Sequence, residues 1–337
     1  MVRCLELIKV GRSIDRTIKQ SENQTIHFIY YLQFPQPTQY FFMKKDSRHL
    51  LLILFSFLFF SISLDAQNNY KPRVIMLGAH PDDCDEAGGT AALFAQMGCA
   101  VKFVSVTNGD AGHQILKGEE LAKRRYAEAM EAGKRLGVTY VVLNNHDGLL
   151  MPTLEVRMQV IKEIREWNAD IVIAPRPNDY HPDHRYTGVL VQDAAYMVAV
   201  PDIEPETPAL KKNPVFLYYQ DHFQRPNPFR PDIAVDISSV YDKKIYALDA
   251  HESQMYEWLP WIGHYSEEVP ANKADRIKWL ATRINREITP VIYASLEKWY
   301  GKQKAAGVKH AEVFEICEYG AQPKEDEIKK LFPMLGN

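Results

Sequence analysis

The chain has 337 residues, which is enough for one large domain or for two of ordinary size. Hydrophobic residues make up 46% of the sequence and charged residues 25%, a composition typical of globular proteins. The formal net charge of −3 argues against a surface built to bind nucleic acid or anionic lipid, so we expect neither as a partner.

The N-terminal part carries one targeting signal. An apolar run of 15 residues, Leu50–Leu64, follows three basic residues between positions 44 and 48, and the small residue Ala66 stands just beyond it. This pattern predicts a secretory signal peptide over residues 43–66. The run is short for a bilayer core of about 30 Å, so we expect cleavage and no stable membrane span afterwards. The mature protein would then be secreted or periplasmic.

Met43 stands where such a signal should begin. We therefore expect translation to start there, and residues 1–42 to be a non-native extension that comes from a wrongly assigned start. Peptides from upstream of Met43 in the unprocessed precursor would contradict this expectation.

Short apolar runs and helical segments alternate in the next part of the chain. The runs predict strands at residues 73–79, 101–106, 140–143 and 170–174. Helices are expected between them, at residues 86–97, 117–136 and 153–167. Because the strands lack a clean polar alternation, both of their faces should be covered, as in a largely parallel sheet built from βαβ units.

The later part is less regular. Strands are expected at 215–219 and 233–237, with a proline-rich loop between them, and helices at 240–255 and 271–300. The sequence has no internal repeat, low-complexity linker or break in composition, so we predict one domain over residues 70–337.

Two motifs rich in His, Asp and Pro follow predicted strands. GAHPDD, at residues 78–83, ends the first strand, and NDYHPDHR, at residues 178–185, comes shortly after the fourth. Ligands of parallel sheets bind at the carboxyl ends of the strands, so both motifs should lie at one edge. A lone HPDD could be a turn that caps the next helix, but two such motifs favour a metal site.

Imidazole and carboxylate groups together suit zinc. A catalytic zinc site offers about three protein ligands and leaves one position for water. Two histidines and one aspartate would supply the ligands, and the remaining aspartate and histidine could serve as base and acid.

The order of motifs resembles the PIG-L/LmbE-like family of zinc-dependent de-N-acetylases. The resemblance runs from about Val74 to Arg185 and has a further echo at residues 251–254. The elements that carry it are AHPDD, Gly88-Gly89-Thr90, Thr107-Asn108-Gly109-Asp110, Arg125 with Glu128 three residues later, and HPDH. It implies a Rossmann-like α/β fold and hydrolysis of N-acetyl groups from glucosamine-containing molecules.

The resemblance also implies roles for single residues. His80, Asp83 and His184 resemble the metal ligands, and Asp82 resembles the general base that activates a zinc-bound water. His181 resembles the residue that, as imidazolium, stabilises the oxyanion and protonates the leaving amine.

Three further residues complete the predicted site. Asp183 would orient His181, in keeping with carboxylate–histidine pairing around metals. Arg125 resembles a substrate-binding arginine, although a plain helix-surface pair with Glu128 is the alternative. Tyr180 is a second candidate for substrate contact, with packing as the alternative.

Other residues leave alternatives open. The family tends to place an acidic residue where this chain has Cys84, and Asp85 or Glu86 could substitute for it. An aromatic group around residues 256–265 could form a platform for a sugar or could pack in the core.

The resulting hypothesis is a zinc-dependent hydrolase with a small-molecule or glycan substrate. Iron or another divalent cation could use the same ligands. Two alternatives are a metal-dependent hydrolase of another amide or ester, and a non-catalytic carbohydrate-binding protein on the same fold. Asp82 and His181 speak against the second, because a binder needs neither a base nor an acid.

Overall fold

The structure, a computed structural model, describes residues 70–335. The predicted extension at 1–42 and signal peptide at 43–66 therefore lie outside the described residues and stay predictions. The described residues fall within one compact unit. In this part of the chain, no helix combines the length and the apolar character that a membrane crossing requires.

A seven-stranded sheet forms the centre of this unit, in the order β3-β2-β1-β4-β5-β7-β6. The first five strands in this order are parallel, and they are β3 (Thr139–Asn145), β2 (Ala100–Thr107), β1 (Arg73–Gly78), β4 (Ile171–Ala174) and β5 (Val215–Tyr219). The last two, β7 (Ala311–Gly320) and β6 (Ile233–Asp236), continue the sheet in antiparallel fashion. The prediction of an α/β fold with a largely parallel sheet is confirmed.

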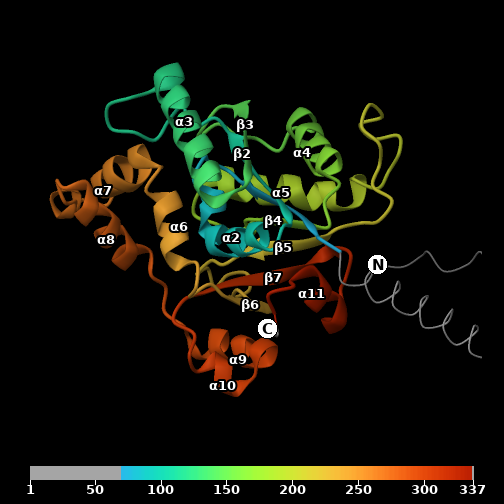
Figure 1. The fold of residues 1–337 in the computed structure, drawn as a ribbon. Coiled ribbons are helices and arrows are strands. Elements are labelled where there is room, and N and C mark those ends of the chain that lie inside the picture. The colour runs from blue at the N-terminus through green and yellow to red at the C-terminus, as the bar shows by residue number, and fades with distance from the viewer. Residues whose placement is uncertain (1–69, 336–337) are drawn as a thin grey trace, which may run out of the picture. The chain divides into compact units, whose positions relative to one another are not determined.

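Helices cover both faces of the sheet, which explains why β1 has no polar side chain after Arg73 (Figure 1). Val74 and Met76 point into a core shared with α2 (Gly88–Gln96) and α3 (Gly118–Leu136). Ile75 and Leu77 point the other way, into a core shared with α4 (Leu154–Trp167) and α5 (Pro182–Met197). A strand buried on both faces has no polar side, as expected in a parallel sheet.

The structure differs from the sequence prediction at two helices. The helix expected at 271–300 is two helices, α8 (Lys273–Ile284) and α9 (Pro290–Tyr300), because Thr289 caps the second and Pro290 opens it. The helix expected at 240–255 ends at Leu248 as α6 (Tyr241–Leu248).

The remaining elements were not predicted from the sequence. They are β7 and α5, already described, together with η1 (Asp83–Ala87), η2 (Ser253–Trp258), α7 (Leu259–Ile262), η3 (Ser266–Glu268), α10 (Lys302–Ala305) and α11 (Glu325–Leu331). Of these, η2 is a single π-helical turn, a feature that often marks functional sites.

The strand order reverses between β1 and β4, which are hydrogen-bonded neighbours. Chain connections leave these two strands toward opposite sides, and the crevice between their carboxyl ends is where open α/β sheets bind ligands. The first His/Asp motif stands at the end of β1, and the second follows β4 and runs into the first turn of α5. The topology therefore brings the two motifs together at this crevice.

Candidate metal centre

The first motif is a tight turn in which Asp83 folds back toward β1. The Asp83 amide donates to the carbonyl oxygen of His80 at 3.2 Å. Its Oδ2 atom accepts from the amides of Ala79 and His80, each at 2.8 Å. Gly78 permits this approach, because a Cβ at that position would lie 2.5 Å from the Cβ of Asp83. Local sequence thus fixes the carboxylate in place.

The second motif begins α5. His181 is the N-cap residue, and its Nδ1 accepts from the amide of Asp183 at 3.2 Å. Pro182 follows at the first helical position, where its fixed φ suits the helix. The first turn of α5 then carries Asp183 and His184, so the helix start aims both side chains at the crevice.

Three atoms from the two motifs form a nearly equilateral triangle. His80 Nδ1 lies 3.2 Å from His184 Nε2, and Asp83 Oδ2 lies 3.5 Å from the first nitrogen and 3.4 Å from the second. A tetrahedral zinc ion with bonds of about 2.0–2.2 Å holds its ligand atoms about 3.3–3.6 Å apart. The spacing of the three predicted ligands is therefore compatible with a tetrahedral zinc ion.

The other nitrogen of each histidine faces a carboxylate. His80 Nε2 lies 3.1 Å from Asp147 Oδ1, and His184 Nδ1 lies 3.0 Å from Asp179 Oδ1. Carboxylates in this position fix the tautomer of metal-binding histidines and make them better ligands. Sequence reasoning missed both residues as members of the site. Asp179 stands inside the second motif, whereas Asp147 follows β3 and no pattern in the sequence connects it to His80.

The electrostatics of the triangle favour a cation. Burial opposes a charge on His80, but the carboxylates of Asp83, Asp147 and Asp183 outweigh it and raise its pKa well above the usual value. For His184, burial is likewise outweighed, by Asp83 and Asp179, and the pKa rises to about 10. A field that holds protons this strongly on imidazole also stabilises a divalent ion in their place.

Asp82 lies beside the triangle. Its Oδ2 accepts from the side-chain amide of Gln254 at 3.1 Å, while Oδ1 is buried and has no hydrogen-bond partner among the described residues. Burial and the charge of Asp83 raise the pKa of Asp82. A carboxylate with a raised pKa and a free oxygen is suited to accept a proton near neutral pH.

His181 borders the same space. Its ring lies edge-on to that of His80 with centroids 4.7 Å apart, and one of its nitrogens lies within 4.8 Å of ligand nitrogens of His80 and His184. His80, His181 and His184 thus also lie close enough to share one metal ion, as a set that has His181 in place of Asp83. Burial and the neighbouring charges of His80 and His184 lower the pKa of His181.

The predicted role of Asp183 requires a correction. Its carboxylate does not orient His181 but points to the amide of Gly148 at 2.7 Å and to His80 Nε2 at 3.5 Å. The orienting contact to His181 comes instead from the backbone amide of Asp183. The N-cap geometry of α5 is the reason, because it turns the His181 ring onto the helix start.

The predicted substrate-binding arginine is buried beside the site, and its predicted role stays untested. Arg125 is only 2% exposed, and its guanidinium donates to backbone carbonyls, to Asp147 and to Gln254. It makes no surface pair with Glu128 either, since Glu128 accepts from Arg124 and from Ser253. In contrast, Tyr180 is 72% exposed and sets its ring edge against His181 and His184, where a substrate could reach it.

Residues 251–254, which resemble a later part of the family pattern, also lie beside the site. His251 Nε2 lies 3.0 Å from Asp85 Oδ2, and both side chains are buried. Asp85, rather than Glu86, thus supplies a buried acid after the paired aspartates. Of the aromatic group, Tyr256 packs in the core, whereas Trp258 and Trp261 stack at 5.4 Å and Trp261 remains about half exposed.

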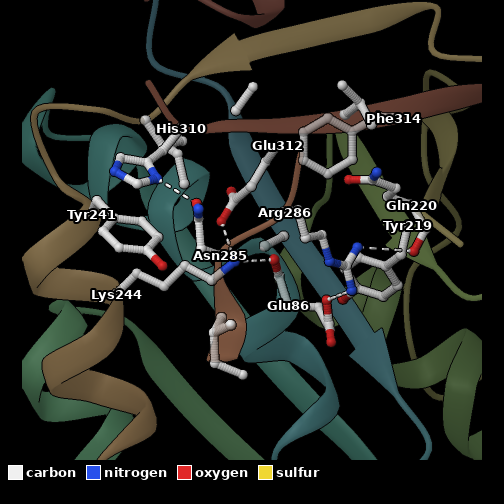
Figure 2. A pocket seen from close by; sticks show the side chains of 15 residues that line it. Glu86, Tyr219, Gln220, Tyr241, Lys244, Asn285, Arg286, His310, Glu312 and Phe314 are labelled. Atoms are coloured by element: carbon white, nitrogen blue, oxygen red, sulfur yellow. Dashed lines mark hydrogen bonds and ion pairs between the residues drawn. The ribbon is translucent and has the colours of Figure 1, made fainter. Parts of the chain in front are cut away.

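A pocket that is open to solvent lies against the start of α2, away from the metal centre (Figure 2). Its charges form two ion pairs, Arg286 with Glu86 and Lys244 with Glu312, the latter at 2.8 Å. Glu312 also accepts from the first amides of α2, which no N-cap side chain serves. This pocket holds none of the predicted site residues, and its charges anchor the helix that follows η1.

Comparison with known proteins agrees with this geometry. The sequence model of the PIG-L family, described as GlcNAc-PI de-N-acetylase, matches residues 75–195. The chain is 33% identical over 210 residues to a diacetylchitobiose deacetylase of Thermococcus kodakarensis, an alignment that covers 58% of this chain and 76% of the relative. It is also 26% identical over 200 residues to a 4-oxalmesaconate hydratase of Pseudomonas putida, covering 57% of this chain and 77% of that protein.

Among solved structures, the N,N'-diacetylchitobiose deacetylase from Pyrococcus horikoshii, in complex with its inhibitor MPG, is similar with a TM-score of 0.56 and 26% identity. The match covers 78% of this chain and 92% of that one. The similarity extends over three quarters of the first curated relative and includes both His/Asp motifs within the matched family region. The chain therefore belongs to the PIG-L family, the LmbE-like group of deacetylases.

Proposed function

We propose that the protein is a metal-dependent N-deacetylase that removes the acetyl group from an N-acetylglucosamine-type sugar or glycoconjugate. The observation that carries this proposal is the triangle of His80 Nδ1, Asp83 Oδ2 and His184 Nε2, with the Asp82 carboxylate beside it. The diacetylchitobiose deacetylases among its relatives, which act on an N-acetylated sugar by name, support the choice of substrate.

The donor set suits zinc, and Fe²⁺ or another divalent cation could use the same ligands. When bound, the cation supplies a Lewis acid that polarises the amide carbonyl and makes water acidic enough to react at neutral pH. Asp147, 3.1 Å from His80 Nε2, and Asp179, 3.0 Å from His184 Nδ1, are the carboxylates that would orient these ligands.

Asp82 is the proposed general base. Its unpartnered Oδ1 is the atom that would take the proton of the attacking water, and its raised pKa favours that transfer. The same proton is then available for the nitrogen that leaves as a free amine. Gln254 holds the other oxygen, Oδ2, in position.

His181 is the proposed donor to the developing oxyanion. Because its Nδ1 accepts the Asp183 amide, the neutral ring carries its proton on Nε2. We therefore assign donation to the oxyanion from Nε2–H of His181.

An amine-release assay tests the proposal directly. Protein loaded with zinc and protein treated with a chelator are each incubated with N-acetylglucosamine and with N,N'-diacetylchitobiose. We expect release by the loaded protein only, and loss of release in Asp82→Asn with zinc content unchanged. No release from either sugar, or release that survives chelation, would overturn the proposal.

The similarity to a hydratase defines the second candidate activity, addition of water to an unsaturated acid. Deacetylation takes precedence because the deacetylase relative is 33% identical and the hydratase 26% identical over alignments of similar length. Adding 4-oxalmesaconate to the assay panel separates the two activities.

We also propose that the protein is exported, on the strength of the signal-peptide pattern at residues 43–66. N-terminal sequencing of the mature protein tests this. A mature chain that retains residues 50–64 would contradict it.

A further inference from the structure

Two tryptophans follow the part of η2 that reaches the proposed base. Gln254, near the start of η2, donates to Asp82 Oδ2 at 3.1 Å. Trp258 ends the same element, and Trp261 follows it in α7. Their indole rings stack with centroids 5.4 Å apart and an interplanar angle of 21°. The segment that contacts the base therefore continues into an aromatic surface, which we call the tryptophan pair.

The loop between β2 and α3 connects the tryptophan pair to the site. A Cβ built on Gly112 of this loop would lie 3.5 Å from Trp258 Nε1 and 3.8 Å from Arg125 Nη1. Gly112 thus lies between the indole and the guanidinium that is buried beside the site. His113 Nε2 lies 2.8 Å from Glu257 Oε2 and ties the loop to η2. Figure 1 shows the loop and α7 on the same side of the sheet.

The tryptophan pair differs from tryptophans that serve the core. The indole N–H groups of Trp167 and Trp299 donate to backbone carbonyls, each at 2.8 Å. Among the described residues, no such hydrogen bond is made by Trp258 or Trp261. Trp261 is 47% exposed, although the stack covers one of its faces. The pair therefore offers solvent a large apolar surface together with indole donors that the protein does not use.

A pyranose ring has the complementary chemistry. The C–H bonds on the face of an N-acetylglucosamine ring form an apolar patch that fits an indole. The hydroxyls around its edge can accept hydrogen bonds from indole N–H groups. A flat aromatic surface beside a site for an N-acetylated sugar therefore suits another ring of the same chain.

We propose that Trp261, supported by Trp258, binds a sugar ring of the substrate other than the ring that is deacetylated. The substrate class would then be an oligosaccharide of N-acetylglucosamine rather than the single sugar. This inference deepens the proposed deacetylase function and rests on it for the kinetic part of its test. The tryptophan pair lies outside residues 75–195, which the family model matches, so its role is in the specificity of this chain and not in the chemistry.

A series of chain lengths tests the proposal. The zinc-loaded protein is assayed with N-acetylglucosamine, N,N'-diacetylchitobiose and N,N',N''-triacetylchitotriose. We expect kcat/KM to rise with chain length, because binding of a ring that does not react can lower the barrier at the ring that does. Trp261→Ala should lower kcat/KM for the oligosaccharides about 5- to 20-fold, as expected for the loss of one aromatic contact. For the single sugar, kcat/KM should stay within about twofold.

Binding without turnover gives a second readout. Asp82→Asn protein is titrated calorimetrically with the single sugar and with the trisaccharide. Adding Trp261→Ala should weaken binding of the trisaccharide about 5- to 20-fold, and Trp261→Phe should weaken it less, because a smaller ring remains. Zinc affinity should not change in either variant. Tyr196→Ala is the control, since Tyr196 is 73% exposed near the end of α5, far along the helix from His184.

The outcomes distinguish the possible roles. Wild-type kinetics and binding in Trp261→Ala would overturn the proposal, and so would equal losses for the single sugar and the oligosaccharides. Because Trp261 is half exposed, its replacement should move the thermal midpoint by less than about 3 °C. Should Trp261→Ala fail to fold, Trp261→Phe carries the test. If the wild-type protein releases no amine but binds the trisaccharide through Trp261, the proposed function fails and the sugar-binding role stands.

Discussion

Replacing Asp179 tests whether the carboxylate behind His184 tunes a metal ligand. Asp179 Oδ1 lies 3.0 Å from His184 Nδ1 and also accepts from the His181 amide at 2.9 Å. Asp179→Asn keeps an oxygen for both contacts and removes only the charge. Asp179→Ala removes the contacts as well.

The expected magnitudes follow from these contacts. A hydrogen bond to a charged group contributes about 1.5–3 kcal/mol and a neutral one about 0.5–1.5 kcal/mol, so the asparagine variant should lose about 1–1.5 kcal/mol of zinc binding. This corresponds to about a tenfold weaker affinity. The alanine variant should bind zinc about 10- to 100-fold more weakly, the usual effect of removing a carboxylate behind a histidine ligand.

Competitive titration of zinc-free protein against a chromophoric chelator measures these affinities. Asp193→Asn, on the same helix α5 as His184 but paired with Arg157, is the control and should bind zinc like the wild type. Wild-type affinity in both Asp179 variants would refute the reasoning, because His184 would then bind zinc without help from Asp179 or would not bind it at all.

Three further predictions concern the metal site and the stability of the fold. Gly78→Ala should weaken zinc binding by at least about tenfold in the same titration, because the new Cβ would displace Asp83; Gly307→Ala, at an uncrowded position, should not. Arg165→Met should lower the thermal midpoint by about 5–10 °C, because the buried Arg165 guanidinium donates to six backbone carbonyls between residues 197 and 207, and an unchanged midpoint would contradict this. Glu312→Gln should destabilise by about 3–5 kcal/mol in urea unfolding, since it leaves Lys244 buried without its counter-ion, and adding Lys244→Met should recover part of the loss. If the double variant is no more stable than Glu312→Gln, the lost stability comes instead from the contacts of Glu312 with the first amides of α2.

The strand and helix pattern of the first half was readable from the sequence because it is local. Apolar runs such as Val74–Leu77 must be strands covered on both faces, and the structure divides their side chains between two cores. The break between α8 and α9 was missed because the apolar pattern continues across it. Only the N-cap residue Thr289 and the following Pro290 mark the start of a new helix. Strand β7 was missed because Glu312 and Glu315 interrupt its apolar pattern, although β5 and β6 pair with it on both sides.

Within the site, the sequence by itself predicted the three ligands and the base, through the resemblance of its two motifs to the family. These residues lie in two short motifs, and their geometry depends on near neighbours, as when Asp83 accepts from the amides three and four positions before it. The orienting and positioning residues were decided only by the tertiary structure. Asp147 lies 22 positions from Arg125, and Gln254 lies 129 positions from Arg125 and 172 from Asp82. No local pattern encodes contacts at such separations, because they exist only once the strand order has brought β1, β3, α3 and η2 to one crevice.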